Sequence, residues 1–318
     1  MNLLEQIEHE WAKGAGKIAA GWAVKLKKAK DSLGPARQKF YQWYPLIIYT
    51  SYSNAIDRRC PFSVRYLGQE VAMLRVKSDG VYICISKEHA VANRRFGMTL
   101  LPREYPWRNV EAKEFRRHFR SLEHREYHSS VNEEHRIESE ILQHMKNRTG
   151  SKFNGTLRGI QPVTLGGLPF QLPVPISGHT GIPQLRKNSH GNIDILARRG
   201  TGRGTRISVW ELKRPDEEAQ AIKQAYIYSV TLLKMLRMPQ SGEIWYNDII
   251  GFRGKIPCKL AMECVVALSF ASAKTREKFE EKMQSFKDQN ALRIGNDTIS
   301  LHIAHYQKEP LTVELKNF

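Results

Sequence analysis

Long hydrophobic segments are absent from this chain of 318 residues. No run of about 18 apolar residues occurs, so we expect no membrane-spanning helix. The first residues, MNLLEQIEHEWAKGAG, carry acids early and lack a continuous apolar stretch, so we expect no secretory signal. Internal repeats and low-complexity tracts are also missing. With 41% apolar and 9% aromatic residues, the chain can nevertheless bury a core in one large or two ordinary domains.

Cysteine is scarce, with four residues in the chain: Cys60, Cys84, Cys258 and Cys264. They form no CxxC pair and no Cys/His cluster with the spacing of a zinc site. Four cysteines in a chain of this length do not make a disulfide scaffold, which favours a reducing, cytoplasmic location.

Acidic residues are too few to balance the basic ones: 32 Asp and Glu face 50 Lys and Arg, a net charge of +18. Residues 1–150 hold 26 basic and 17 acidic side chains, and residues 151–318 hold 24 and 15. The excess is therefore spread over both halves. It favours a polyanionic partner, because Lys and Arg release counterions when they bind phosphates. A soluble basic protein without such a partner is the alternative.

The N-terminal part begins with a predicted helix over residues 3–33, followed by a β-rich segment over 45–86. Apolar residues of the helix recur at a spacing of three to four: Leu4, Ile7, Trp11, Ile18 and Trp22. Turn signals at Leu67-Gly68 and Ser78-Asp79-Gly80 separate the strands. We expect a small antiparallel sheet that reads a substrate, docks a partner or serves as a structural accessory.

Helical periodicity returns over residues 111–147, where Ile137, Ile141 and Met145 lie four apart and form one stripe. The apolar run 264–271 predicts a buried strand, and it is followed by an amphipathic helix and a final strand over 300–306.

The most informative stretch is residues 191–233, which reads as strand, basic turn, strand and helix. Asp194 lies on the first strand, and Glu211 and Lys213 lie near the end of the second. Side chains alternate between faces along a strand, so Glu211 and Lys213 share a face. If the register aligns the strands, Asp194 joins them, while Trp210 and Leu212 pack on the other side.

These side chains suit phosphodiester chemistry. Carboxylate oxygens are hard ligands, and Mg²⁺ is held in proteins by one or two of them together with water and phosphate. A lysine beside such carboxylates would position a water molecule or neutralise charge on the phosphate. Gln224 and Tyr228 lie at i and i+4 on the following helix and project together.

This order of residues resembles the PD-(D/E)XK nuclease superfamily, in particular RecB-like and archaeal-type members that carry a QxxxY helix. The resemblance covers about residues 130–305 and implies an α/β, restriction-endonuclease-like αβββαβ core. It implies catalytic roles for Asp194, Glu211, Lys213, Gln224 and Tyr228. No proline precedes Asp194, where the sequence reads Gly191-Asn192-Ile193.

A glutamate on the helix before the sheet completes the metal site in the resembling proteins. Glu138 is the expected ligand beside Asp194 and Glu211, and Glu134 and Glu140 are the alternatives. We therefore expect a nuclease-like domain over residues 128–318, after an N-terminal α+β accessory domain over 1–127.

The glycine-rich turn 197–206 lacks the GK[ST] of a nucleotide-binding loop. Either it is a flexible solvated turn, or its arginines touch the DNA backbone. The residues expected to bind nucleic acid are Arg199, Arg203, Arg206 and Arg214. His179 and His190 are expected to be loop residues rather than catalytic bases.

The resemblance implies a Mg²⁺-dependent DNA endonuclease, with Mn²⁺ able to substitute, in defence, restriction or repair. The N-terminal domain would then bind DNA, dock a protein partner or mediate a homodimer. DNA is favoured over RNA by the resemblance and by the lack of an RNA-binding aromatic motif. Two alternatives are a catalytically inactive nucleic-acid-binding module on a nuclease fold and an assembly protein with acidic partners.

Overall fold

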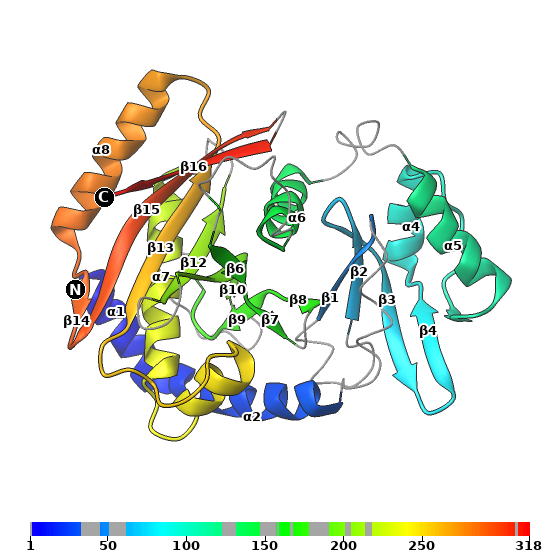
Figure 1. Cartoon of the computed structure of the whole chain (residues 1–318), viewed down its shortest axis with the longest axis horizontal. Coiled ribbons are helices and arrows are strands. Elements are labelled where there is room, and N and C mark those ends of the chain that lie inside the picture. Colours follow the sequence, from blue (N-terminus) through cyan, green and yellow to red (C-terminus); the bar gives the residue numbers. More distant parts are fainter. Residues whose placement is uncertain are drawn as a thin grey trace. The chain divides into compact units, whose positions relative to one another are not determined.

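The computed structural model is mixed α/β (Figure 1). It describes residues 2–32, 45–50, 62–122, 132–146, 157, 159–165, 168–177, 191–200, 205–213, 218–308 and 311–318. The chain divides by its internal contacts into two units, each built on its own sheet. The C-terminal unit comprises Met1–Val24, Leu142–Val163 and Leu172–Phe318, and the N-terminal unit comprises Lys25–Ile141 and Thr164–Gln171.

The large sheet of the C-terminal unit has the strand order β14-β15-β13-β12-β11-β6, with β16 also paired to β15. Its strands are β6 (Ile160–Pro162), β11 (Ile195–Arg199), β12 (Arg206–Leu212), β13 (Ala261–Leu268), β14 (Arg293–Ile294), β15 (Asp297–Lys308) and β16 (Leu311–Asn317). β6, β11 and β12 pair antiparallel, whereas β12, β13 and β15 pair parallel. The apolar run predicted as a buried strand is confirmed in β13, which begins three residues earlier than the prediction.

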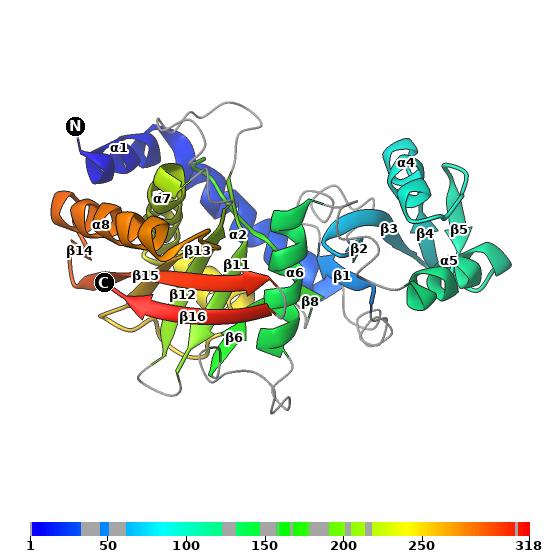
Figure 2. The ribbon, with the colours of Figure 1, turned by 90° about the horizontal axis from the view of Figure 1, so that it is seen from above.

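Helices cover one face of this sheet, as α1, α7 and α8 show in Figure 2. α7 (Glu218–Leu236) makes the crossover between the parallel strands β12 and β13, and α8 (Ala273–Gln289) leads from β13 towards β15. A π-helical segment, η7 (Ile244–Ile249), follows α7. A short antiparallel pair, β9 (Leu172–Val174) and β10 (Gly191–Ile193), precedes β11. β9 contains Pro173.

The N-terminal helical segment differs from its prediction in two ways. It comprises α1 (Leu3–Glu10), η1 (Trp11–Ala15) and α2 (Gly16–Ser32), with a kink at Gly14, whose φ is 153°. Such a φ is open to glycine, and it rotates the following turns, so Ile18 is 39% exposed while Ala19 and Ala23 are buried. Residues 1–24 also group with the C-terminal unit and not with the rest of the predicted 1–127 domain, because α1 packs on α7.

The N-terminal unit holds the small antiparallel sheet that the sequence predicts, with strands in sequential order. The strands are β1 (Ile47–Thr50), β2 (Phe62–Tyr66), β3 (Gln69–Lys77), β4 (Gly80–Cys84) and β5 (Glu104–Pro106). Both predicted turns are two-residue connections, since Tyr66 pairs with Gln69 and Lys77 pairs with Gly80. At the first turn, Leu67 and Gly68 both have positive φ, and a Cβ at Gly68 would meet the carbonyl of His135 at 2.1 Å.

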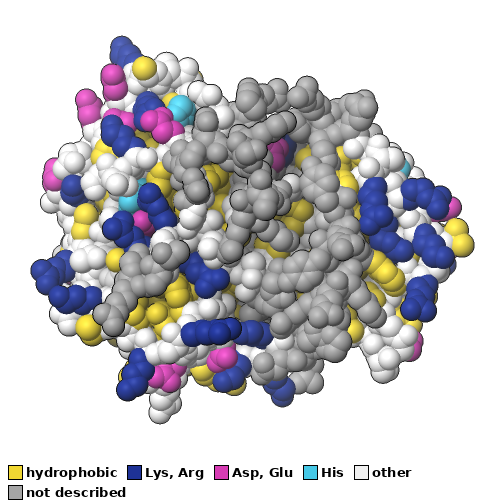
Figure 3. Space-filling model, in the orientation of Figure 1, with side chains coloured by type: hydrophobic (Ala, Val, Ile, Leu, Met, Phe, Trp, Pro, Cys, Tyr) yellow, Lys and Arg dark blue, Asp and Glu magenta, His cyan; other side chains and the backbone are white. Residues whose placement is uncertain are grey.

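Helices α4 (Lys87–Arg95) and α5 (Val110–Ser121) pack on this sheet through an aromatic core that includes Tyr66, Phe96 and Phe119. The next helix, α6 (Glu133–Lys146), begins in the N-terminal unit, and its predicted stripe of Ile137, Ile141 and Met145 is buried. The hairpin of β7 (Thr164–Leu165) and β8 (Leu168–Pro169) completes the unit. Lys and Arg side chains gather over the surface of α4 and α5 (Figure 3).

Candidate active site

The hairpin β11–β12 sets the candidate carboxylates opposite each other. Asp194 was predicted on a strand, but it is a bend residue between β10 and β11. The register pairs Ile195 with Trp210, and extending it by one position places Asp194 opposite Glu211. Alternation along β12 then puts Glu211 on the opposite face from Trp210, whose indole is fully buried and donates to Ser208 Oγ at 2.8 Å. The strand geometry therefore brings Asp194 and Glu211 together, as the alternation of residues predicts.

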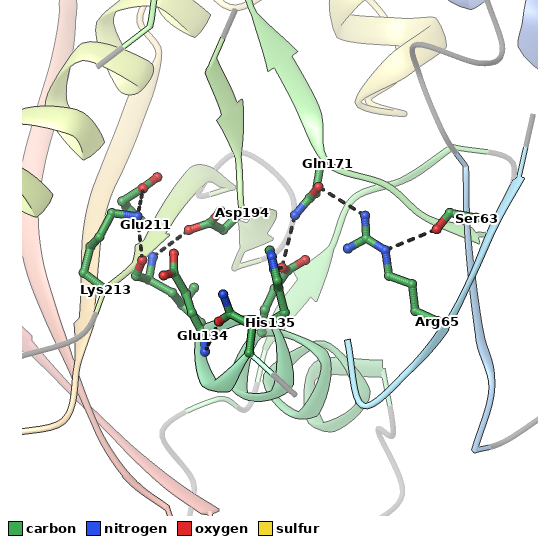
Figure 4. A network of polar contacts seen from close by, with 11 residues as sticks. Ser63, Arg65, Glu134, His135, Gln171, Asp194, Glu211 and Lys213 are labelled. Carbon is green, nitrogen blue, oxygen red and sulfur yellow. Dashed lines mark hydrogen bonds and ion pairs between the residues drawn. The ribbon is translucent and has the colours of Figure 1, made fainter. Parts of the chain in front are cut away.

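Lys213 completes this cluster immediately after β12 (Figure 4). Its Nζ lies 2.8 Å from Oε1 of Glu211 and donates to the carbonyl of Leu212 at 3.0 Å. Its backbone N–H donates to the carbonyl of Ala267 on β13 at 3.2 Å. Glu211 and Lys213 are 1% and 6% exposed. Two opposite charges are thus buried as a pair, which is stable only where both keep a partner.

Asp194 is held by the backbone of the opposite strand. Its Oδ2 accepts a hydrogen bond from the N–H of Leu212 at 2.8 Å. The bond fixes one carboxylate oxygen at the end of the β11–β12 ladder, next to Leu212, which lies between Glu211 and Lys213 in the sequence.

Helix α7 contributes the predicted Gln224–Tyr228 pair. Nε2 of Gln224 donates to the Tyr228 hydroxyl at 2.9 Å, and the two side chains are 2% and 1% exposed. Oε1 of Gln224 is buried without a hydrogen-bond partner within the described residues. Tyr228 also lies against β10, because a Cβ at Gly191 would come within 2.4 Å of its hydroxyl oxygen. The pair is therefore packed against the strand that leads into Asp194.

The three candidate glutamates of α6 differ in their surroundings. Glu138 is 2% exposed, and its Oε2 accepts from Gln171 Nε2 at 3.1 Å, a bond inside the N-terminal unit. Glu140 forms an ion pair with Arg136 at 2.6 Å, and Glu134 is half-buried near the start of the helix. Glu138 is therefore the most buried of the three, and its place beside Asp194 and Glu211 stays a prediction.

Two of the predicted nucleic-acid-binding arginines lie on the hairpin and share a buried partner. Arg199 and Arg206 pair across β11 and β12, and each lies 3.4 Å from Oε1 of Glu263, which is fully buried on β13. Arg203 and Arg214 lie outside the described residues, as do His179 and His190.

Sequence reasoning missed Glu263 and its neighbour His302. His302 is 1% exposed, and burial lowers the pKa of its imidazole below the usual value. One signal was present: Glu263 is the single charged residue in the otherwise apolar segment AMECVVAL. A lone acid in a buried strand needs a cationic partner, and the two hairpin arginines supply it.

No group of three or more His, Cys, Asp or Glu side chains is gathered to hold a metal ion within the part of the chain that the structure describes. Across those same residues, no helix has the length and apolar character needed to cross a membrane. Comparisons of the chain with protein-family models, curated proteins and solved structures find no match.

Proposed function

We propose that the chain is a metal-dependent nuclease that hydrolyses phosphodiester bonds of DNA, with its site at the end of the β11–β12 hairpin. The observation that carries this proposal is the placement of Asp194 opposite Glu211, with Lys213 ion-paired to Glu211 at 2.8 Å. A buried lysine beside two carboxylates is costly, since each charge loses water, and a site for charged chemistry accounts for that cost.

The order and direction of the elements support a PD-(D/E)XK core. Along the chain, α6 precedes β6, β11 and β12, with the short strands β7 to β10 between β6 and β11, and then α7 and β13 follow. Without the short strands, this is the αβββαβ order. The first three strands pair antiparallel and the last one pairs parallel to β12. Glu211 lies on β12, the strand that pairs antiparallel with β11 on one side and parallel with β13 on the other.

The donor set fits a hard divalent cation such as Mg²⁺ or Mn²⁺. Asp194 and Glu211 would hold it, since the described residues gather no third acidic, histidine or cysteine side chain beside them. When bound, such an ion polarises the phosphoryl oxygen and lowers the pKa of a bound water molecule. Oxygen ligands from two carboxylates, completed by water and phosphate, are the usual surroundings of Mg²⁺ in proteins.

The side chains of the chain have separate tasks in this scheme. The Leu212 amide orients the carboxylate of Asp194, and the Leu212 carbonyl and Glu211 hold the ammonium group of Lys213. Lys213 would stabilise negative charge that develops on the phosphate. The buried Oε1 of Gln224 offers an acceptor for a water molecule or a substrate proton, while Tyr228 fixes the amide from its other end.

DNA is the proposed substrate, and the positive charge of both halves supports a polyanion. We place the activity in the cytoplasm, as an endonuclease of defence, restriction or repair. Arg199 and Arg206 flank the hairpin and are partly exposed, so they can reach the DNA backbone while they neutralise Glu263. The N-terminal unit is proposed to contact DNA, a protein partner or a second copy of the chain.

A cleavage assay with Asp194→Asn tests the proposal. Asparagine retains an oxygen that accepts from Leu212 N–H, so the fold is expected to survive while the negative charge is lost. Cleavage of DNA by the wild-type protein should require Mg²⁺ or Mn²⁺ and stop with EDTA. The variant should lose at least about a hundredfold in rate, the usual effect of removing one electrostatic contribution to a transition state.

The matched control is Asp288→Asn on α8, an exposed aspartate that also accepts one side-chain hydrogen bond, from Gln284 at 2.8 Å. It should cleave at the wild-type rate. Equal rates for Asp194→Asn and the wild type would overturn the site, and a wild-type protein that cleaves no DNA with either metal would overturn the function. Single-stranded, double-stranded, branched and RNA substrates should be compared in the same assay.

A further inference from the structure

Helix α5 of the N-terminal unit separates its charges by flank. An α-helix turns by about 100° per residue. Viewed down the axis of α5, four basic side chains fall within one sector about 100° wide: Lys113, Arg116, Arg117 and Arg120. The opposite flank carries the acids, Glu111 and Glu114. Between the two lies the buried stripe of Ala112, Phe115 and Phe119. We call the four-residue sector the basic flank.

Packing holds the basic flank in place. Phe115 and Phe119 are fully buried, with their ring centroids 4.9 Å apart, so the helix cannot roll on the sheet without losing core contacts. At the edge of the flank beside the buried stripe, Arg116 lies 3.8 Å over the ring of Trp107 and donates to the Trp107 carbonyl at 2.9 Å. The cations therefore project from a fixed scaffold, which lowers the entropy cost of binding.

One of the two acids of the helix has a partner outside it. Glu111, on the far side, is engaged by Arg103 at 3.1 Å. Burial, and after it the nearby charge of Arg120, lowers the pKa of Arg116, so positive charges crowd one another along the flank. Lys113 and Arg117 are exposed, and Figure 3 shows basic side chains gathered over this part of the surface.

We propose that the basic flank of α5 binds the phosphate backbone of DNA. Lys113 and Arg120 are seven residues apart, which is about 10.5 Å along the helix axis. One strand of duplex DNA presents a phosphate about every 3.4 Å of axis, so the flank spans about three phosphates. Contacts of this kind position a duplex without reading its sequence. The choice of DNA rests on the proposed function, whereas the basic flank itself is a feature of α5 alone.

The test measures salt-dependent binding of a fluorescein-labelled, mixed-sequence DNA duplex by fluorescence anisotropy. Every protein carries Asp194→Asn and EDTA is present, so binding is read without cleavage. The test variant adds Lys113→Gln and Arg117→Gln, which keep good helix formers at both positions. The control instead adds Lys274→Gln and Lys278→Gln, which remove two exposed cations from α8, where Glu277 and Glu281 are interleaved with them.

Two lost phosphate contacts should reduce the slope of log K against log salt by about 1.8. Between about 50 and 200 mM salt, both proteins lose affinity. The fold-loss of the parent should be about twelve times the fold-loss of the test variant. The control should keep the parental slope. Circular dichroism should show the same helical content for all three proteins.

An unchanged slope for the test variant, or an equal reduction in the control, would overturn the assignment of the flank. Equal competition by poly-L-glutamate at the same charge concentration would overturn the choice of nucleic acid as the partner. Binding and cleavage are read separately. If the slope is reduced but the wild-type protein cleaves no DNA with Mg²⁺ or Mn²⁺, the role of the basic flank is retained and only the proposed function is refuted.

Discussion

Gly191 offers the sharpest test of how the candidate site is packed. A Cβ at this position would lie 2.4 Å from the Tyr228 hydroxyl oxygen and 2.5 to 2.6 Å from two ring carbons. These distances are too short for any pair of non-bonded atoms, and Tyr228 is 1% exposed and has little room to move. Gly191→Ala should therefore destabilise the protein by about 1–3 kcal/mol, the usual cost of overpacking.

Thermal unfolding followed by circular dichroism would measure the effect. For a unit of this size, each kcal/mol corresponds to about 2–4 °C, so Tm should fall by several degrees. Gly21→Ala is the matched control, since no atom lies within 4 Å of the added Cβ on an exposed face of α2. That change should raise stability by up to about 1 kcal/mol, because alanine restricts the unfolded chain and favours helix.

A double-mutant cycle separates the clash from other causes. Tyr228→Leu removes the ring that the new methyl group meets, so the combined Gly191→Ala and Tyr228→Leu protein should regain part of the loss. We expect a coupling of about 0.5–3 kcal/mol, as for residues in direct contact. Additive effects, or a Gly191→Ala protein as stable as the wild type, would refute the packing of α7 against β10.

Three other predictions concern polar contacts. Asp297→Ala should lower the free energy of unfolding in urea by about 2–3 kcal/mol, because Arg237 and a buried backbone N–H lose their acceptor. A loss under about 0.5 kcal/mol would contradict the ion pair of Asp297 with Arg237. Burial lowers the pKa of His302, so the unfolded state binds more protons as the pH falls below about 6.5, and stability should decline there by at most about 1.4 kcal/mol per pH unit. His302→Gln should flatten this decline, and an unaltered pH profile would rule out the histidine as its source. Tyr228→Phe should cost about 1–2 kcal/mol by removing the acceptor of the buried Gln224 amide, and denaturant titration would show it.

The candidate site follows from the sequence because its geometry is local. Alternation along a strand puts Glu211 and Lys213 on one face, and a hairpin joins strands that are close in sequence, so Asp194 meets Glu211 once the register is set. A spacing of four places Gln224 beside Tyr228 on any helix. The small sheet of the N-terminal unit was predictable for the same reason, since two-residue turns join its β2–β3 and β3–β4 pairs.

Contacts between distant parts of the chain could not be predicted in this way. The grouping of residues 1–24 with residues 172–318 depends on α1 packing against α7, more than 200 residues away. The buried face of the N-terminal helix was predicted with Ile18 on it, whereas the kink at Gly14 turns Ile18 outward and buries small residues instead. Neither effect leaves a periodic trace in the sequence.

The backbone bond between Lys213 and Ala267 has a consequence for the order in which the chain assembles. Asp194 meets the Leu212 amide within a hairpin whose contact closes 18 residues, whereas Lys213 is fixed to a strand 54 residues further on. Closing a loop three times longer costs about 1 kcal/mol more in chain entropy. The two carboxylates can therefore come together while the protein is still being synthesised. The backbone of Lys213 gains its hydrogen bond to β13 only after β13 has left the ribosome, so in an unfinished chain the candidate site lacks this bond.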